Sequence, residues 1–252
     1  MTWAPVLSTV VGGEEGETET MDDTTMRSRR RAIWLAWGAI GGVVVFNLGW
    51  LLAGALQGDG YSVASHDVSD LGALTARSPW VMLTAQVIAG TLIIAFALFA
   101  LGPALAVPGR GPALGAWLLA ASLIGLDNLS DTFFRLDCRA ADQGCTAAAA
   151  ASSWHGQVHI AVGLLSAIAM VAAPFFLAAR MRQANGWRDL ARPTILAGAL
   201  LLVVLLGYAA LERETGGGYL QRAAIVLVSV GVAMLALRVR ALARSRDVVL
   251  QR

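Results

Sequence analysis

Six long apolar runs divide the sequence into segments of membrane-spanning length. They cover residues 32–57, 79–106, 113–136, 154–181, 193–211 and 219–242. An α-helix rises 1.5 Å per residue, so about 20 apolar residues cross the hydrocarbon core of a bilayer. The runs are apolar on nearly all faces, as lipid-embedded helices are. We therefore predict an all-α integral membrane bundle of six transmembrane helices, with the lipid bilayer as its partner.

The composition agrees with a membrane protein. Of the 252 residues, 57% are hydrophobic and only 14% are charged, whereas about a quarter of a soluble domain is charged. The net charge is +2, and the basic residues lie at the ends of the apolar runs. No basic, aromatic-rich soluble face remains for DNA or RNA. A nucleic-acid partner is therefore not expected.

The distribution of arginine predicts the orientation. All 19 basic residues are Arg, and fourteen of them fall on the side that carries both termini, against five on the other side. Positively charged loops stay in the cytoplasm, so we expect both termini to be cytoplasmic and the membrane to be the plasma membrane. Residues 1–31, an acidic stretch followed by an Arg cluster, are predicted to be a disordered tail. Residues 243–252 are predicted to be a cytoplasmic tail.

Two polar pairs lie on either side of one outer loop. Asp127 and Asp131 close the third run in L-D-N-L-S-D, and His155 and His159 open the fourth in W-H-G-Q-V-H. Residues four apart share one helical face and lie ~6 Å apart. A carboxylate inside a membrane costs ~2.5–3.5 kcal/mol, so Asp127 should face the bundle interior. We expect the two pairs to lie close together at the outer interface.

One interpretation of these pairs is a catalytic metal site. Three neutral imidazoles, those of His66, His155 and His159, with a carboxylate or water would form a tetrahedral zinc set. Zinc lowers the pKa of its bound water to about 7 and so supplies hydroxide. Asp127 or Asp131 would then be the general base. This is a hypothesis of a zinc-dependent hydrolase.

The other interpretation is structural. Asp127 would form an ion pair, for example with Arg222, or the cluster would only hold the helices together. The soluble zinc proteases place a Glu directly after the first His of H-E-x-x-H. Gly156 occupies that position here, so that specific chemistry is excluded.

Cys138 and Cys145 are the only cysteines, and both lie in the outer loop between the third and fourth runs. An oxidising compartment favours a disulfide between them, which would hold this loop in shape. Two metal thiolates are the alternative, although zinc pairs usually sit closer in sequence and come with a second pair.

Four phrases recur in order along the chain. They are Y-S-V-A-S-H-D-V-S-D-L-G (61–72), F-R-L-D-C (134–138), W-H-G-Q-V-H (154–159) and G-Y-L-Q-R (218–222). Together they resemble a large bacterial family of multi-span proteins known as domain of unknown function nine-nine-eight. The resemblance covers about residues 33–240 and carries no activity. It implies that such a protein is built on Ser69, Asp70, Asp137, His155, His159, Gln221 and Arg222.

A looser resemblance points to the alkaline ceramidase superfamily of membrane hydrolases. These proteins use Ser-x-x-x-His, an Asp and a later His-x-x-x-His around zinc. The matching residues here are Ser62, His66, Asp67, Asp70, His155 and His159. The chain departs from that pattern in having six spans instead of seven. Its His-x-x-x-His also lies in the fourth span and not in the last.

The sequence leaves three functions open. The first is a metal-dependent hydrolase of a lipid-like substrate at the outer leaflet, with Asp70, Gln221 and Arg222 as ligand-binding residues and Arg222 holding an anionic head group. The second is a non-catalytic sensor or assembly protein, in which the polar cluster holds helices together. The third is a proton-coupled carrier, because intramembrane Asp and His also form proton relays.

Overall fold

The structure is a computed structural model that describes residues 14–58, 60–211 and 216–250. Within these residues, all regular secondary structure is helical. The main helices are α1 (Glu14–Ala55), α2 (Pro79–Phe96), α4 (Leu114–Ala120), α7 (Trp154–Met181), α8 (Arg188–Ala210) and α9 (Gly217–Leu250). Shorter elements are η1 (Ser69–Gly72), η2 (Ala97–Leu101), α3 (Gly102–Ala104), η3 (Leu123–Asp127), α5 (Asn128–Ser130) and α6 (Ala147–Ala150).

Five helical stretches are long and apolar enough to cross a membrane. They are Thr24–Ala55, Pro79–Ala104, Trp154–Met181, Arg188–Ala210 and Gly217–Ser245. The third predicted run is a shorter apolar segment, Leu114–Ser130. The chain therefore has the membrane-embedded, all-helical character that the sequence predicts.

The elements form a closed ring. α1 packs against α2 and α9, α9 packs against α8, α8 against α7, and α7 against α4 and η3, which in turn contact α2. Glycines permit the closest approaches. A Cβ on Gly49 of α1 would lie 2.3 Å from Ala85 Cβ of α2, and one on Gly90 would lie 2.8 Å from the carbonyl oxygen of Gly125. Small residues at such crossings allow backbones to pack closely within membranes.

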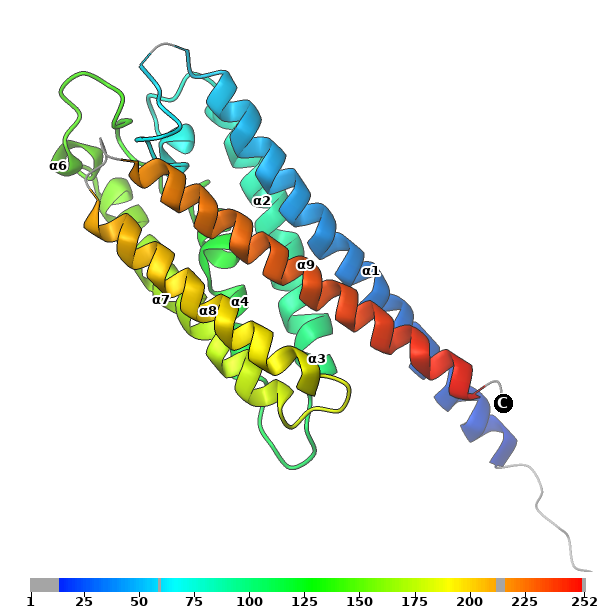
Figure 1. Cartoon of the computed structure of the whole chain (residues 1–252). Helices are drawn as coiled ribbons and strands as arrows, with labels where there is room; N and C mark the ends of the chain where they lie inside the picture. Colours follow the sequence, from blue (N-terminus) through cyan, green and yellow to red (C-terminus); the bar gives the residue numbers. More distant parts are fainter. Residues whose placement is uncertain (1–13, 59, 212–215, 251–252) are drawn as a thin grey trace, which may run out of the picture.

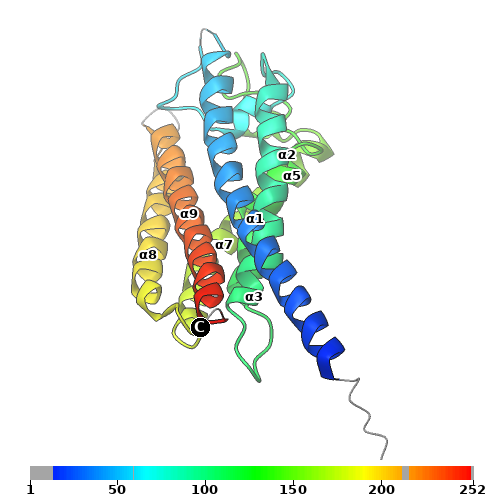
Figure 2. The ribbon, with the colours of Figure 1, turned by 90° about the vertical axis from the view of Figure 1, so that its right-hand side faces the viewer.

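The two ends of the bundle differ in character (Figures 1 and 2). α1 begins and α9 ends at one end, which we call the terminal end. The segments 56–78 and 131–153, which contain η1 and α6, lie at the opposite end, and we call them the cap. The cap therefore covers the end of the ring that lies opposite the termini.

Two helices begin earlier in the chain than the apolar runs do. Residues from Glu14 onward are helical, so most of the predicted disordered tail continues α1. α8 begins at Arg188 and contains Pro193, which has no N–H to bond to the carbonyl of Asp189. Residues 1–13 and 212–215 lie outside the described residues.

Candidate functional site

The third segment is broken inside the bundle. α4 ends at Ala120, and Ser122 has an extended backbone, with φ −78° and ψ 175°. Its hydroxyl donates to the carbonyl of Leu119 at 2.7 Å, which satisfies an acceptor freed by the break. The chain then resumes as the π-helical turn η3 and ends in turns after Ser130. The helical part of the third run therefore ends at Ser130 and is interrupted at Ser122. Asp127 and Asp131, which follow the break, are both buried.

Asp131 is the centre of a buried polar cluster. Its Oδ2 accepts a 2.6 Å hydrogen bond from the Gln86 amide of α2. Its Oδ1 lies 2.9 Å from His159 Nδ1 of α7. All three side chains are buried. Three elements that are distant in the sequence are therefore joined at one carboxylate.

Asp127 lies one turn away but is bonded differently. Its Oδ1 is buried and has no hydrogen-bond donor, and Gly163 of α7 is its neighbour across the gap. The side chain lines a cavity of about 90 Å³ together with Gln86, Asn128 and Gln221. The Gln86 Oε1 is also buried without a donor. Two acceptor atoms at the cavity therefore lack a donor, and its volume suffices for several waters or one small polar group.

The two histidines of W-H-G-Q-V-H clamp the chain that leaves the third segment. His155 Nδ1 lies 3.1 Å from the carbonyl oxygen of Phe133, and His159 Nδ1 lies 3.1 Å from that of Phe134. Both contacts require the Nδ1–H tautomer, because a carbonyl only accepts. Carbonyl groups at the end of a helix lack partners within the helix. The two histidines, one turn apart on α7, each reach one of two successive carbonyls of this kind. The His155 ring also lies 3.7 Å from the Trp154 ring, centroid to centroid.

Arg222 binds the main chain of the cap. Its Nη1 donates to the carbonyls of Val63, His66 and Gly218 at 2.8–2.9 Å, and its Nη2 donates to the Tyr61 hydroxyl. The guanidinium also lies over the rings of Trp50 and Tyr61. Burial raises the pKa of the Tyr61 hydroxyl, and the nearby guanidinium opposes this rise.

Neighbouring residues of α8 and α9 complete this attachment. Gln221 Oε1 accepts from the Val68 N–H at 2.6 Å, and the Tyr208 hydroxyl donates to Asp67. A Cβ on Gly218 would lie 2.6 Å from the carbonyl oxygen of Val63. Gln221 and Arg222, both predicted as ligand-binding residues, thus bind the segment 61–68. No ion pair joins Asp127 to Arg222 within the described residues.

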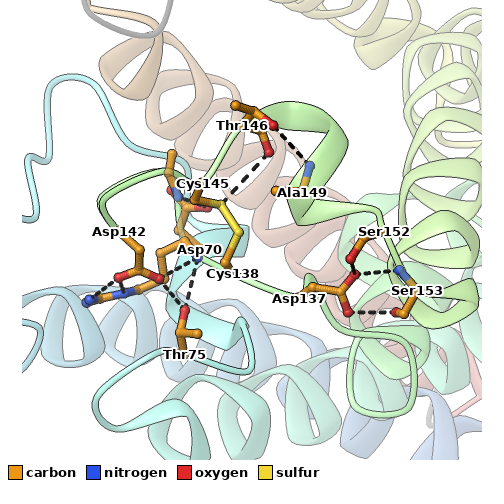
Figure 3. Close-up of a disulfide and its surroundings, with 12 residues drawn as sticks. Asp70, Thr75, Asp137, Cys138, Asp142, Cys145, Thr146, Ala149, Ser152 and Ser153 are labelled. Carbon is orange, nitrogen blue, oxygen red and sulfur yellow. Dashed lines mark hydrogen bonds and ion pairs between the residues drawn. A yellow bond between two sulfur atoms is a disulfide. The ribbon is translucent and has the colours of Figure 1, made fainter.

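Asp137 fixes the start of α7. Its carboxylate accepts from the hydroxyls of Ser152 and Ser153 and from the N–H of Ser153 at 2.6–3.0 Å (Figure 3). These bonds, led by that of the Ser153 hydroxyl, lower the pKa of Asp137. The Ser153 hydroxyl in turn caps α7 by accepting from the Gly156 N–H.

A disulfide joins Cys138 to Cys145, with their Cα atoms 6.1 Å apart (Figure 3). The loop that it closes contains Arg139 and Asp142, which form an ion pair. Thr75 bonds to Asp142, which ties this loop to the segment 56–78. Burial raises the pKa of Asp142, but the bonds from Arg139 and Thr75 outweigh it and the net pKa is lowered.

His66 belongs to the cap and not to the polar cluster. Its Nδ1 accepts from the Ser62 N–H at 2.9 Å, and its ring lies beside that of Tyr61. Within the ranges that the structure describes, no group of three or more His, Cys, Asp or Glu side chains could hold a metal ion. The three histidines are thus not brought together as the zinc hypothesis requires, because each ring is already turned toward its own stretch of main chain.

A comparison with protein-family models identifies the family of this chain. The family model described as "Protein of unknown function (DUF998)" matches residues 27–238. The chain belongs to the DUF998 family. No curated protein and no solved structure matches it, and the resemblance to alkaline ceramidases gains no support.

Two of the four recurring phrases of this DUF998 protein lie in the cap, and the other two bind it from the starts of α7 and α9. The segment 61–72 is held by α9 through Gln221 and Arg222. The segment 134–138 is held by the start of α7 through Asp137. Asp70, also predicted as a ligand-binding residue, is 1% exposed, and its Oδ1 accepts from the N–H of Ala140. Ser69 lines the cavity beneath the cap.

The sequence reasoning missed Gln86, which bonds to Asp131. The signal was present, because Gln86 is the only strongly polar residue within the apolar run 79–106. A polar side chain at that depth needs a partner. Asn128 was likewise overlooked; it lines the same cavity and is 2% exposed.

Proposed function

We propose that this DUF998 protein is a ligand-binding membrane protein whose polar cavity holds the head group of a lipid-like molecule. The observation that carries the proposal is the buried Asp127 oxygen that has no donor and lines the cavity. A buried polar group costs free energy until it is hydrogen-bonded. The Gln86 Oε1 beside it has the same need. The ligand therefore has to supply donors.

The charges in the cluster favour a cationic head group. His159 is placed to neutralise Asp131, from which it lies 2.9 Å. Asp127 is a second buried carboxylate, and its Oδ1 has no hydrogen-bond donor. An ammonium group supplies both the positive charge and up to three donors. An alkyl amine is thus the simplest ligand that satisfies the cavity.

A second cavity offers room for the apolar part of such a ligand. It has a volume of about 110 Å³ and lies between α7, α8 and α9 on the side toward the terminal end. Its lining is apolar apart from Thr194, and Met170 lines both cavities. The two cavities together suit a molecule with a polar head and an apolar chain. A proton-coupled carrier would need a polar path through the bundle. The apolar lining of this second cavity does not favour such a path.

We further propose that the polar cavity opens toward the outer leaflet and that both termini are cytoplasmic. Fourteen arginines lie on the terminal side and five on the cap side, which fits the positive-inside rule. The cap disulfide also fits an oxidising compartment. A zinc hydrolase is not favoured, because His66 is engaged in the cap and lies outside the polar cluster.

The test uses three ligands of equal chain length: dodecylamine, dodecanol and dodecanoate. The full chain is purified in a neutral maltoside detergent, and the rise of its unfolding midpoint is measured against ligand concentration, since binding to the folded state stabilises it. We expect the amine to bind most tightly and the carboxylate least. Asp127→Asn should weaken amine binding by about 10- to 100-fold, the value of one charged hydrogen bond.

Asp189→Asn is the matched control, because Asp189 is an exposed carboxylate at the terminal end, paired with Arg238. It should leave amine binding unchanged. A protein that binds dodecanoate as tightly as dodecylamine would contradict the cationic head group. Equal loss of binding in both variants would show that the amine acts at no specific carboxylate.

A further inference from the structure

A second polar cavity, unrelated to the cluster around Asp131, lies at the terminal end. Its volume is about 590 Å³, and its walls come from α1, the end of the second span, the turn before α8, and α9. Three arginines of α1 line it, namely Arg27, Arg29 and Arg31. The cavity is therefore large and strongly basic.

The lining has the chemistry of a phosphate site. Guanidinium groups match phosphate oxygens with paired hydrogen bonds. Arg27 and Arg31 are one helical turn apart and so project from the same side of α1. Ser28 and Asn185 add polar groups to the walls. The Arg31 guanidinium lies 5.1 Å from the centroid of the Phe99 ring, which holds it against the second span.

The remaining walls are apolar and lie at the depth of lipid head groups. Phe99, Pro103 and Leu242 line the cavity. The apolar run of α1 begins directly after Arg31, and Trp34, 74% exposed, follows within one turn. Exposed tryptophans sit at the membrane–water interface. A ligand here would meet arginines on one side and hydrocarbon on the other.

We propose that this cavity binds the phosphodiester head group of an anionic phospholipid, with Arg27 and Arg31 as its main contacts. Basic residues immediately beside a membrane span attract anionic lipids, and the cavity gives that attraction a defined site. The proposal is independent of the ligand bound at Asp127 and of which leaflet the terminal end faces.

The test measures lipid binding to the full chain in neutral detergent. Dioctanoyl phosphatidylglycerol and dioctanoyl phosphatidylcholine are titrated, and binding is read from the unfolding midpoint and from native mass spectra. We expect the wild-type chain to bind the glycerol lipid more tightly than the choline lipid. The double variant R27Q/R31Q should weaken phosphatidylglycerol binding by about 30-fold and leave phosphatidylcholine binding unchanged.

The control variant R110Q/R192Q removes two arginines that the sequence places on the same side of the membrane as Arg27 and Arg31. Neither of them lines the cavity. It should bind phosphatidylglycerol like the wild type. An equal loss in both double variants would overturn the site in favour of general charge attraction. Binding of the two lipids with the same affinity would overturn the anionic preference. Competition by glycerol phosphate at similar concentration would show that the site takes soluble phosphates, and would overturn the assignment to a lipid.

Discussion

The imidazole Nδ1 of His159 lies 2.9 Å from Oδ1 of Asp131, so the two spans that carry them are tied at one buried point. The second oxygen of Asp131 accepts from Gln86 of α2. Asp127, one turn earlier, has no such donor. Both carboxylates line the same cavity, but they differ in role. Asp131 holds helices together through Gln86 and His159, and Asp127 has an oxygen without a donor.

This difference predicts unequal effects on stability. Asp131→Ala leaves His159 Nδ1 with one acceptor fewer and the Gln86 amide with none, and each lost buried bond costs about 1–3 kcal/mol. We expect the free energy of unfolding in detergent to fall by about 2–4 kcal/mol. Asp127→Asn should change it by less than about 1 kcal/mol, since Oδ1 loses no donor. Similar destabilisation by both changes would contradict the division of roles.

The sequence predicted part of this arrangement, and the missing part has a physical cause. The spacing of four placed His155 and His159 on one face, and one short loop brought them near the Asp pair. The hydrogen bonds to the carbonyls of Phe133 and Phe134 could not be predicted, because main-chain acceptors leave no mark in a sequence. The break at Ser122 could not be predicted either, because the residues on both sides of it continue the apolar run.

The six predicted spans show a similar limit. Hydropathy predicted the fourth span, Trp154–Met181, with both of its bounds. It could not show that the third run stops at Ser130, because Phe133 and Phe134 continue the apolar pattern outside the helix. The role of Arg222 was also beyond pattern reasoning. An arginine at a helix start is equally suited to an anionic head group and to carbonyls of a loop, and only the folded cap decides between them.

The disulfide should contribute measurably to stability. Cys138 and Cys145 are seven residues apart, and closing so short a loop restricts the unfolded chain by about 2.5 kcal/mol. We expect Cys138→Ser/Cys145→Ser to lower the unfolding midpoint in detergent and to make it insensitive to reductant. The wild-type midpoint should fall to the same value when dithiothreitol is added. A reductant-insensitive wild type would argue against the bond.

Gly156 is expected to tolerate no larger side chain. A Cβ there would lie 2.7 Å from the carbonyl oxygen of Ala150 and 2.8 Å from Ala151 Cα, and main-chain atoms cannot move aside easily. Gly156→Ala should therefore destabilise the protein by about 1–3 kcal/mol. Gly41→Ala in α1 is the control, because a Cβ there meets nothing within 4 Å. It should leave stability unchanged or raise it by up to about 1 kcal/mol. A harmless Gly156→Ala would mean that the start of α7 is not packed as described.

Asp137 makes the stability of the cap dependent on pH. Hydrogen bonds from Ser153 and Ser152 lower its pKa in the folded protein, while in the unfolded chain the value is about 3.9. A group with a lowered folded pKa stabilises the protein above the unfolded value, and this contribution is lost as the pH falls through the folded value. We therefore expect the unfolding midpoint to decline below about pH 4 and Asp137→Asn to flatten that decline.

The matched variant for this experiment is Asp142→Asn. Asp142 also has a lowered pKa, but it acts through Arg139 and Thr75 within the disulfide loop. Each single variant should remove part of the acid sensitivity, and the double variant should remove more than either. Because Asp137 holds the start of α7 and Asp142 holds the disulfide loop, hydrogen exchange at about pH 3.5 should open the first turn of α7 only in Asp137→Asn. An acid profile identical in wild type and both variants would assign the sensitivity to groups other than the cap carboxylates.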